Sequence, residues 1–308
     1  MPSAKRRRLT RVQRQDLATP LVWLYASFAD GIDGGNPAGV VASTGPIDRR
    51  LAQSVAAVMS VPTTGFAVVG PGAAAGSPVN VRFFTPEREI DACGHVTVAL
   101  AVALVESGVW EWGRGGVVRA RGGDFPLRLR NGQVEIDQQL RVLEPAPVGW
   151  SDVEAALGQV RARGDLALEV VGTGLRHLVV PLADPAALAM LTIDAGRIGM
   201  LAASAAVDTV CVWAPTVAAN RFRVRDLCAA IGAVEEPASG TTAAALALYL
   251  AHSGQLVGDE LVVEQGVEMG RPSRIDVSVR PPVAATVRGT ARKVLSGTLT
   301  LPIGSGNG

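Results

Sequence analysis

One histidine and one pair of glutamates have the chemistry and the placement to exchange protons with a small molecule. His95 directly follows Gly94 at the start of a long apolar segment, while Glu235 and Glu236 lie shortly before Gly240, at the start of a second one. A neutral imidazole is a usable acid or base, and adjacent carboxylates repel each other, so that one titrates late. Alternatively, the histidine is structural and the glutamates only complement a helix start.

The two apolar segments predict helices that are buried on every side. They cover 94–108 and 240–254, have the same length, and each begins with Gly and ends with Ser-Gly. The central helices are expected over 95–107 and 241–253. A helix that is apolar all round must be covered all round, and a matched pair about half a chain apart indicates an internal duplication.

Strand-like sequence surrounds both predicted helices. β-branched or aromatic runs, separated by turn residues, occupy 21–28, 66–69, 79–84, 177–180, 207–212 and 275–279. We therefore predict an α+β protein of two pseudo-symmetric domains, each a curved or barrel-like, mainly antiparallel sheet around a central helix. Strands and helices do not alternate as in a Rossmann fold, and no GxGxxG is present.

The domain boundary is expected in the Pro-punctuated stretch 143–149. Residues 20–142 would form the N-terminal half and 143–302 the C-terminal half. Residues 1–19 are expected to be a disordered basic tail, and 303–308 a flexible tail.

Composition excludes several classes of function. A net charge of +1 and only 4% aromatic residues argue against nucleic-acid binding. Cys93, Cys211 and Cys228 do not form a disulfide framework, which favours a reducing compartment and hence the cytoplasm. No apolar run approaches the ~20 residues of a membrane span. The histidines lack metal-ligand spacing, so no metal is expected.

Both predicted helix starts are suited to carboxylate binding. Helix N-termini offer unpaired N–H groups and a partial positive charge, worth about 0.3–1 kcal/mol per contact with an anion. Gly94 and Gly240 would let a ligand approach the backbone closely. If pseudo-symmetry brings both starts to one cleft, that cleft would bind a small carboxylated metabolite. The alternative is that both glycines only cap and pack.

Five blocks of sequence, in order, resemble the PhzF (phenazine-biosynthesis) family of isomerases. They lie at 35–41, 82–95, 173–181, 235–240 and 265–273. The resemblance implies the diaminopimelate-epimerase-like fold, with a cleft between the two helix starts. It also implies no metal or organic cofactor, and a homodimer.

The resemblance also assigns roles to residues. His95 and Glu236 would exchange protons with the substrate, while further residues would bind it. The binding residues are Gly94, Gly240, Thr241, Ser239, Thr64 and Asn36. Glu236 and Thr241 stand where the family usually has Asp and Ser, and they keep the functional groups.

One catalytic position departs from the family pattern. Family isomerases use a glutamate as proton shuttle, and the matching position here holds Thr63. A neutral hydroxyl without a visible activator is a poor base near pH 7. Thr63, Asp33, Glu235 or a group of the substrate itself would have to replace that glutamate.

Three functions follow. The first is a cofactor-independent isomerase that shifts a double bond in a small carboxylated metabolite, in secondary-metabolite (antibiotic) biosynthesis, with 4-alkyl-proline-type diene or imine precursors as candidate substrates. The second is a proline-racemase-like epimerase or dehydratase. Cys93 would be its single thiol, because Ser239 holds the opposite position, although Cys93 also suits a buried packing role. The third is a binding protein that lost catalysis with the glutamate.

Overall fold

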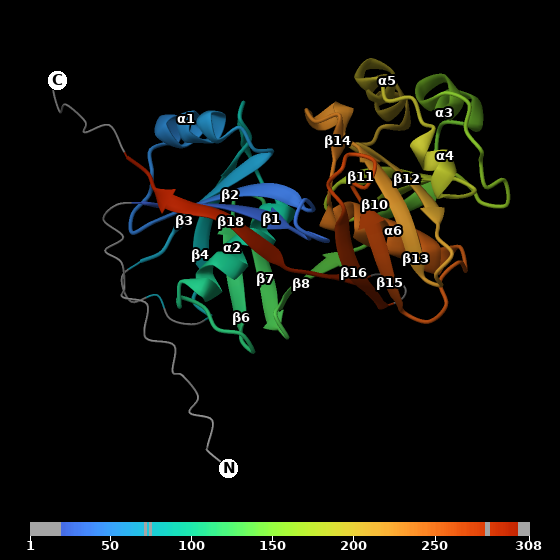
Figure 1. Cartoon of the computed structure of the whole chain (residues 1–308). Coiled ribbons are helices and arrows are strands. Elements are labelled where there is room, and N and C mark those ends of the chain that lie inside the picture. Colours follow the sequence, from blue (N-terminus) through green and yellow to red (C-terminus); the bar gives the residue numbers. More distant parts are fainter. Residues whose placement is uncertain (1–19, 71–72, 74–75, 281–283, 301–308) are drawn as a thin grey trace, which may run out of the picture.

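The computed structural model describes residues 20–70, 73, 76–280 and 284–300, which form two halves lying side by side (Figure 1). In each half, one sheet curls around one helix. The tails predicted at 1–19 and 303–308 lie outside the described residues.

In the first half, the sheet curls around α2 (Gly94–Glu106), and α1 (Arg49–Met59) lies on its outer side. The strands are, in spatial order, β18 (Ala291–Thr298), β1 (Leu21–Ser27), β2 (Asn36–Ser43), β3 (Thr63–Val68), β4 (Val79–Phe84), β6 (Gly115–Ala120), β7 (Gly123–Arg130) and β8 (Gln133–Gln139). A short β5 (Glu89–Ile90) pairs with β4.

The second half repeats this order around α6 (Gly240–His252). Its strands are β9 (Val142–Pro145), β10 (Glu169–Gly172), β11 (Arg176–Pro181), β12 (Thr209–Pro215), β13 (Arg221–Leu227), β15 (Glu260–Gln265), β16 (Ser273–Arg280) and β17 (Ala284–Gly289), with β14 (Glu235–Glu236) on β13. Outside the sheet lie α3 (Trp150–Leu157), α4 (Pro185–Ala189), α5 (Ala195–Ala205) and a 3-10 turn at Ala229–Ile231.

The pairing pattern of the two halves is the same. β2–β3 and β4–β6 are parallel, as are β11–β12 and β13–β15, while the other neighbours are antiparallel. The shared pattern agrees with the duplication that the matched helices indicate.

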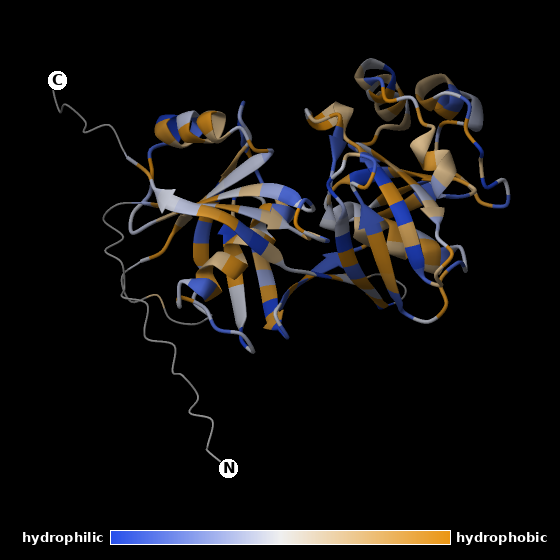
Figure 2. Cartoon of the chain, viewed as in Figure 1, coloured by the Kyte–Doolittle hydropathy of each residue, from blue (hydrophilic) through white to orange (hydrophobic). Residues whose placement is uncertain are grey.

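The two central helices are buried because each is wrapped by its sheet. α2 is buried from His95 to Leu104 and α6 from Thr242 to Leu250. The strands supply the facing apolar layer with alternate residues, as in β16, where buried and more exposed side chains alternate. Figure 2 shows hydrophilic and hydrophobic residues interleaved along the strands. Both helices begin at their glycine, one residue earlier than predicted.

Each half of the chain contributes its last strand to the sheet of the other half. After β8 the chain crosses to the second half and forms β9, and after β17 it returns to form β18 on β1. β8 and β17 also pair with each other and join the two sheets. The predicted C-terminal half, 143–302, therefore needs a correction, because β18 belongs to the first half. Sequence pattern identifies a strand but not its partner, and here β18 covers an edge that β1 would otherwise expose.

Candidate active site

His95 lies on the first turn of α2 and is buried. The Ser27 hydroxyl on β1 donates to the His95 carbonyl at 2.7 Å, and Cys93 Sγ lies 3.4 Å from His95 Nδ1. Burial lowers the pKa of His95 to about 4, against a smaller opposing effect of a hydrogen bond with the Pro37 backbone. The imidazole is therefore neutral near pH 7.

Glu236 lies on β14 and is held by a residue of the other half. Asn36 Nδ2, at the start of β2, donates to Glu236 Oε2 at 2.5 Å and to the Ala238 carbonyl at 2.9 Å. Burial raises the pKa of Glu236 to about 7; the Asn36 hydrogen bond opposes this shift and the charge of Asp226 adds to it. Glu236 can therefore give or take a proton near neutral pH.

Thr63 and Cys93 lie together beside this pair. The Thr63 side chain is buried at the start of β3 and hydrogen-bonds the Cys93 thiol. Burial raises the pKa of Cys93 to about 12, and the charge of Glu236 adds to the shift. Cys93 therefore remains a thiol at neutral pH. Within the described residues, no carboxylate or imidazole hydrogen-bonds Thr63 to activate its hydroxyl.

At the start of α6, Ser239 is the N-cap and accepts a hydrogen bond from the Thr242 N–H at 3.3 Å. Its hydroxyl lies 3.1 Å from Thr241 Oγ1. At the start of α2, a Cβ added to Gly94 would meet no atom of the described residues within 4 Å, so the space there is open. A Cβ on Gly240 would lie 3.4 Å from Val287, an ordinary packing distance.

Three further sequence-based candidates have different surroundings. Thr64 points to the face opposite Thr63, toward Met59 Sδ at 3.8 Å, because successive strand residues face opposite sides. Its side chain is therefore placed away from Thr63, and its role in substrate binding stays a prediction. Glu235 forms a buried ion pair with Arg225 at 2.7 Å and is not free to act as a shuttle. Asp33 is exposed in the wall of a cleft.

Sequence reasoning missed two buried polar residues behind the site. Gln265 Nε2 donates to the Glu236 carbonyl at 2.7 Å, and its Oε1 accepts from the Ser239 N–H at 3.3 Å. Asp226 on β13 lies opposite Glu236 of β14 in the antiparallel strand pair. Gln265 opens the last of the five sequence blocks, which was a usable signal, whereas nothing in the pattern around Asp226 singled it out.

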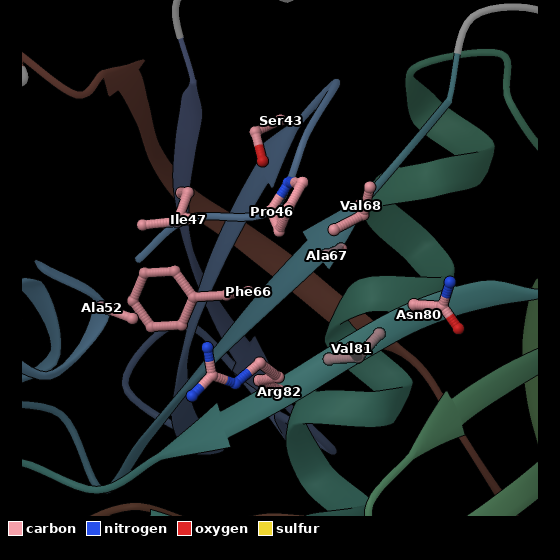
Figure 3. Close-up of a pocket in the computed structure, with 10 residues that line it drawn as sticks. All are labelled: Ser43, Pro46, Ile47, Ala52, Phe66, Ala67, Val68, Asn80, Val81 and Arg82. Atoms are coloured by element: carbon pink, nitrogen blue, oxygen red, sulfur yellow. The ribbon is translucent and has the colours of Figure 1, made fainter. Parts of the chain in front are cut away.

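A cleft of about 770 Å³ lies beside these residues and is lined by both halves. Its walls include Asp33 and Glu235 and the chain neighbours Pro37, Pro62 and Pro237, but none of the proposed catalytic or substrate-binding residues themselves. A smaller cavity of about 280 Å³ lies in the first half under α1 (Figure 3). Its lining is mainly apolar, includes Ile47, Phe66 and Val81, and contains none of the candidate site residues.

The part of the chain that the structure describes contains no cluster of His, Cys, Asp and Glu placed to hold a metal ion. None of its helices is long and apolar enough to cross a membrane.

Comparison with known sequences gives consistent matches over most of the chain. Residues 25–297 match the family described as phenazine biosynthesis-like protein, PhzC-PhzF. An uncharacterized isomerase of Deinococcus radiodurans is 34% identical over 86% of this chain and 86% of its own. The trans-2,3-dihydro-3-hydroxyanthranilate isomerase of Pseudomonas chlororaphis is 29% identical over 80% of this chain and 86% of its own.

Solved structures share the fold. A Bacillus anthracis phenazine biosynthesis protein of the PhzF family superposes with a TM-score of 0.81 at 20% identity, covering 92% of this chain and 99% of that one. A probable proline racemase from Agrobacterium radiobacter K84 gives 0.59 at 13% identity, covering 93% and 94%. The predicted α+β fold class is confirmed.

Proposed function

The chain belongs to the phenazine biosynthesis-like (PhzC-PhzF) family and is an isomerase of that family, and from this premise we propose that it shifts a double bond by proton transfer in a small carboxylated metabolite. The observation that carries the proposal is that a neutral His95 and a Glu236 that titrates near neutrality stand at the two buried helix starts, one in each half. Each lies at or just before the start of a buried helix, and Asn36 ties the two halves together there.

Substrate binding is assigned to the two helix starts. The open space in front of Gly94 and the hydroxyls of Ser239 and Thr241 can receive a carboxylate. The dipoles of α2 and α6 favour its negative charge by up to ~2 kcal/mol in a partly buried site.

The reaction needs one proton acceptor and one proton donor. A proton leaves one carbon, and the electron pair of the broken C–H bond forms the new double bond. The far carbon of the old double bond takes up a proton with the electron pair of that bond. His95 and Glu236 are the groups proposed for this work, because both can change protonation state at moderate cost. Thr63 is assigned a packing role beside Cys93.

For the substrate class, the relatives' names suggest a cyclic diene that carries a carboxylate. The Pseudomonas relatives are named for trans-2,3-dihydro-3-hydroxyanthranilate. We propose a substrate of this kind from secondary metabolism, with 4-alkyl-proline-type diene or imine precursors as the second candidate. The proline-racemase-like alternative loses support, because the one thiol at a helix start is held protonated.

The test uses the whole chain in D2O with a panel of three compounds. They are trans-2,3-dihydro-3-hydroxyanthranilate, a 4-alkyl-proline diene precursor, and L-proline. We expect a change in double-bond position and deuterium at a ring carbon of one of the first two, measured by NMR and mass spectrometry. Exchange at the α-carbon of proline alone would instead support the racemase alternative, and no exchange into any of them would contradict the proposal.

A further inference from the structure

A chain of hydroxyl groups leads from the start of α6 to a buried carboxyl. Ser239 Oγ lies 2.9 Å from Thr242 Oγ1, which lies 2.7 Å from Asp226 Oδ2. A carboxylate can only accept, so the Thr242 hydroxyl donates to Asp226. Thr242 Oγ1 is also the donor toward Ser239 Oγ, and because it carries one proton it donates to only one of the two at a time. A transfer from Ser239 toward Asp226 therefore needs the Ser239 hydroxyl to turn toward the Thr242 oxygen while Thr242 donates to Asp226.

Asp226 is an unusual residue to bury in this way. It is 1% exposed, and its Oδ1 has no hydrogen-bond partner among the described residues. The charged or titratable groups around it are Glu236, Glu235, Cys228 and Cys211, and none of them is a cation. The nearby Arg225 is committed to Glu235.

His177 is the remaining titratable group of this cluster. Its Nδ1 lies 2.7 Å from Thr209 Oγ1 and 3.4 Å from Thr242 Oγ1. Burial lowers the pKa of His177 to about 3, so the ring is neutral and supplies no positive charge. A buried carboxylate with no cation beside it is costly. Burial raises the pKa of Asp226 to about 6, against the opposing hydrogen bonds of Thr242, Thr209 and Cys228, and so within reach of proton exchange near neutral pH.

The first half shows that the architecture does not need this chain. In the strand pair of the first half, Phe83 lies opposite Ile90, which matches Asp226 opposite Glu236 in the second half. Val96 stands two residues after Gly94, which matches Thr242 two residues after Gly240. Phe83 and Val96 are fully buried. The same strand pairing and helix start are therefore built from apolar side chains in one half and from linked polar ones in the other.

We propose that Ser239, Thr242 and Asp226 form a proton relay that makes the start of α6 the proton-accepting side of the active site. This inference rests on the proposed isomerase function and refines it, because the relay takes the proton-accepting role in place of His95 while Glu236 remains the donor. The relay would take over the task of the glutamate whose position Thr63 occupies. Ser239, the N-cap of α6, is the residue proposed to take the substrate proton, and Thr242 and Asp226 act through it.

A substrate proton moves to Ser239 Oγ as the Ser239 proton moves to Thr242 Oγ1 and the Thr242 proton to Asp226 Oδ2. The C–H electron pair stays on the substrate and forms the new double bond, while the far carbon takes a proton from the acid form of Glu236. Asp226 ends as the acid and Glu236 as the carboxylate, so the two carboxyls together hold one proton before and after. Exchange with water in the cleft resets them.

Thr242→Val removes the middle hydroxyl and tests the relay. Thr242→Ser should restore it. The matched control is Thr286→Val, because Thr286 is also buried and also donates to an aspartate at 2.7 Å, Asp137, outside the site. With the compound that the panel identifies, we expect Thr242→Val to lower kcat by about 10²-fold or more with little change in KM. Thr242→Ser should stay within about fivefold of the wild-type kcat, by the same reasoning.

A proton inventory in H2O–D2O mixtures separates a relay from a structural role. Several protons move together in the relay, so kcat of the wild type should curve with deuterium fraction, whereas the residual kcat of Thr242→Val should vary linearly. A wild-type inventory that is linear, or a Thr242→Val variant that loses no more kcat than Thr286→Val, would overturn the relay.

A measurement without substrate keeps this test separate from that of the proposed function. Carboxyl titration of the full chain by 13C NMR should show Asp226 titrating at higher pH in Thr242→Val than in the wild type, because a donor to the carboxylate is lost. Thr286→Val should leave that titration unchanged. If no panel compound reacts, the proposed function fails, while an Asp226 titration that Thr242→Val does not move overturns the relay by itself.

Discussion

At the scale of the residue, one physical cause acts in opposite directions on the two candidate acid–base groups. Burial disfavours charge, so it lowers the pKa of His95 and raises that of Glu236. At neutral pH the imidazole is neutral and the carboxyl is poised between its two forms. Asn36 limits the shift of Glu236 by donating to the carboxylate.

Glu236→Gln should remove an ionisation from the pH profile. The variant can neither accept nor release a proton at this position, so kcat should fall by about 10²–10⁴-fold. The pH profile of the wild-type kcat/KM should show an ionisation near pH 7. If the acid form of Glu236 is the reactive one, kcat/KM should fall above this pH. The profile of the variant should lack this ionisation. Measuring kcat/KM from pH 5 to 9 checks this, and a profile that keeps the ionisation would show that another group titrates there.

The same substitution should affect stability with a definite sign. The folded-state pKa of Glu236 lies above its ordinary value of 4.5, so its contribution to stability is full below pH 4.5 and is lost as pH rises through about 7. Glu236→Gln should therefore be more stable than the wild type at pH 8, by on the order of 1–3 kcal/mol, and similar to it at pH 4. Urea unfolding at both pH values measures the difference, and equal stability at pH 8 would contradict it.

Cys93→Ala should be tolerated. The thiol is held protonated and hydrogen-bonds Thr63, so its removal costs packing rather than a proton acceptor. We expect kcat to stay within about tenfold of the wild type, well short of the loss when an acid–base group is removed. Steady-state kinetics with the panel compound checks this. Loss of all turnover in a variant that still folds would favour the one-thiol alternative.

At the scale of the element, strand alternation decides which of two neighbouring residues reaches the site. On β14, Glu236 faces Asn36 while Glu235 pairs with Arg225. On β3, Thr63 faces Cys93 while Thr64 faces Met59. A one-residue change of register would exchange each pair, so the strand pairing of the two halves fixes the composition of the site.

The end of β1 is a second point where an element positions the site. Phe28 follows β1 with a φ of 62°, a conformation that L-residues other than glycine rarely adopt. Its N–H donates to the Thr290 carbonyl, and its ring packs on Gly289, where the chain leaves the second half. The strained residue thus links β1 to the crossover between β17 and β18.

Gly289→Ala should destabilise this crossover. An added Cβ would collide with the ring carbons of Phe28. Overpacking of this kind costs about 1–3 kcal/mol, which should lower Tm by several degrees. Gly297→Ala on β18 is a matched control, because its Cβ would meet no described atom within 4 Å. Thermal unfolding of both variants tests the point, and equal Tm values would contradict it.

At the scale of the whole molecule, the exchange of β9 and β18 makes the halves interdependent. β18 covers the outer edge of β1, and β8–β17 pairing joins the sheets. The cleft and its two helix starts therefore depend on chain crossings far from the site in sequence.

A chain that ends at Gly289 should not fold stably. It lacks β18, so β1 would lose a full row of hydrogen bonds and present an open edge that favours aggregation. A control chain that ends at residue 300 keeps β18. The two chains are compared by soluble yield and by thermal unfolding. If the shorter chain unfolds cooperatively at the same Tm as the control chain, β18 is dispensable.

The homodimer that the family resemblance implies remains a prediction. β18 carries Val294 and Leu295, which are 48% and 52% exposed in the single chain and are suited to an interface. Light scattering should give a mass near twice 31.8 kDa. A monomer mass at micromolar concentration would contradict the expectation.

The sequence by itself determined the two buried helices, their glycine starts and the duplication, because all-round apolar segments permit few environments. It also singled out His95 and Glu236 as candidates, since both lie in ordered blocks next to those helix starts. Only the tertiary structure decided that Glu235 is neutralised by Arg225, that Thr64 faces away, and that Asp226 lies behind Glu236. These facts depend on pairing across distant strands, and a single sequence records which residues form a strand but not which strand they meet.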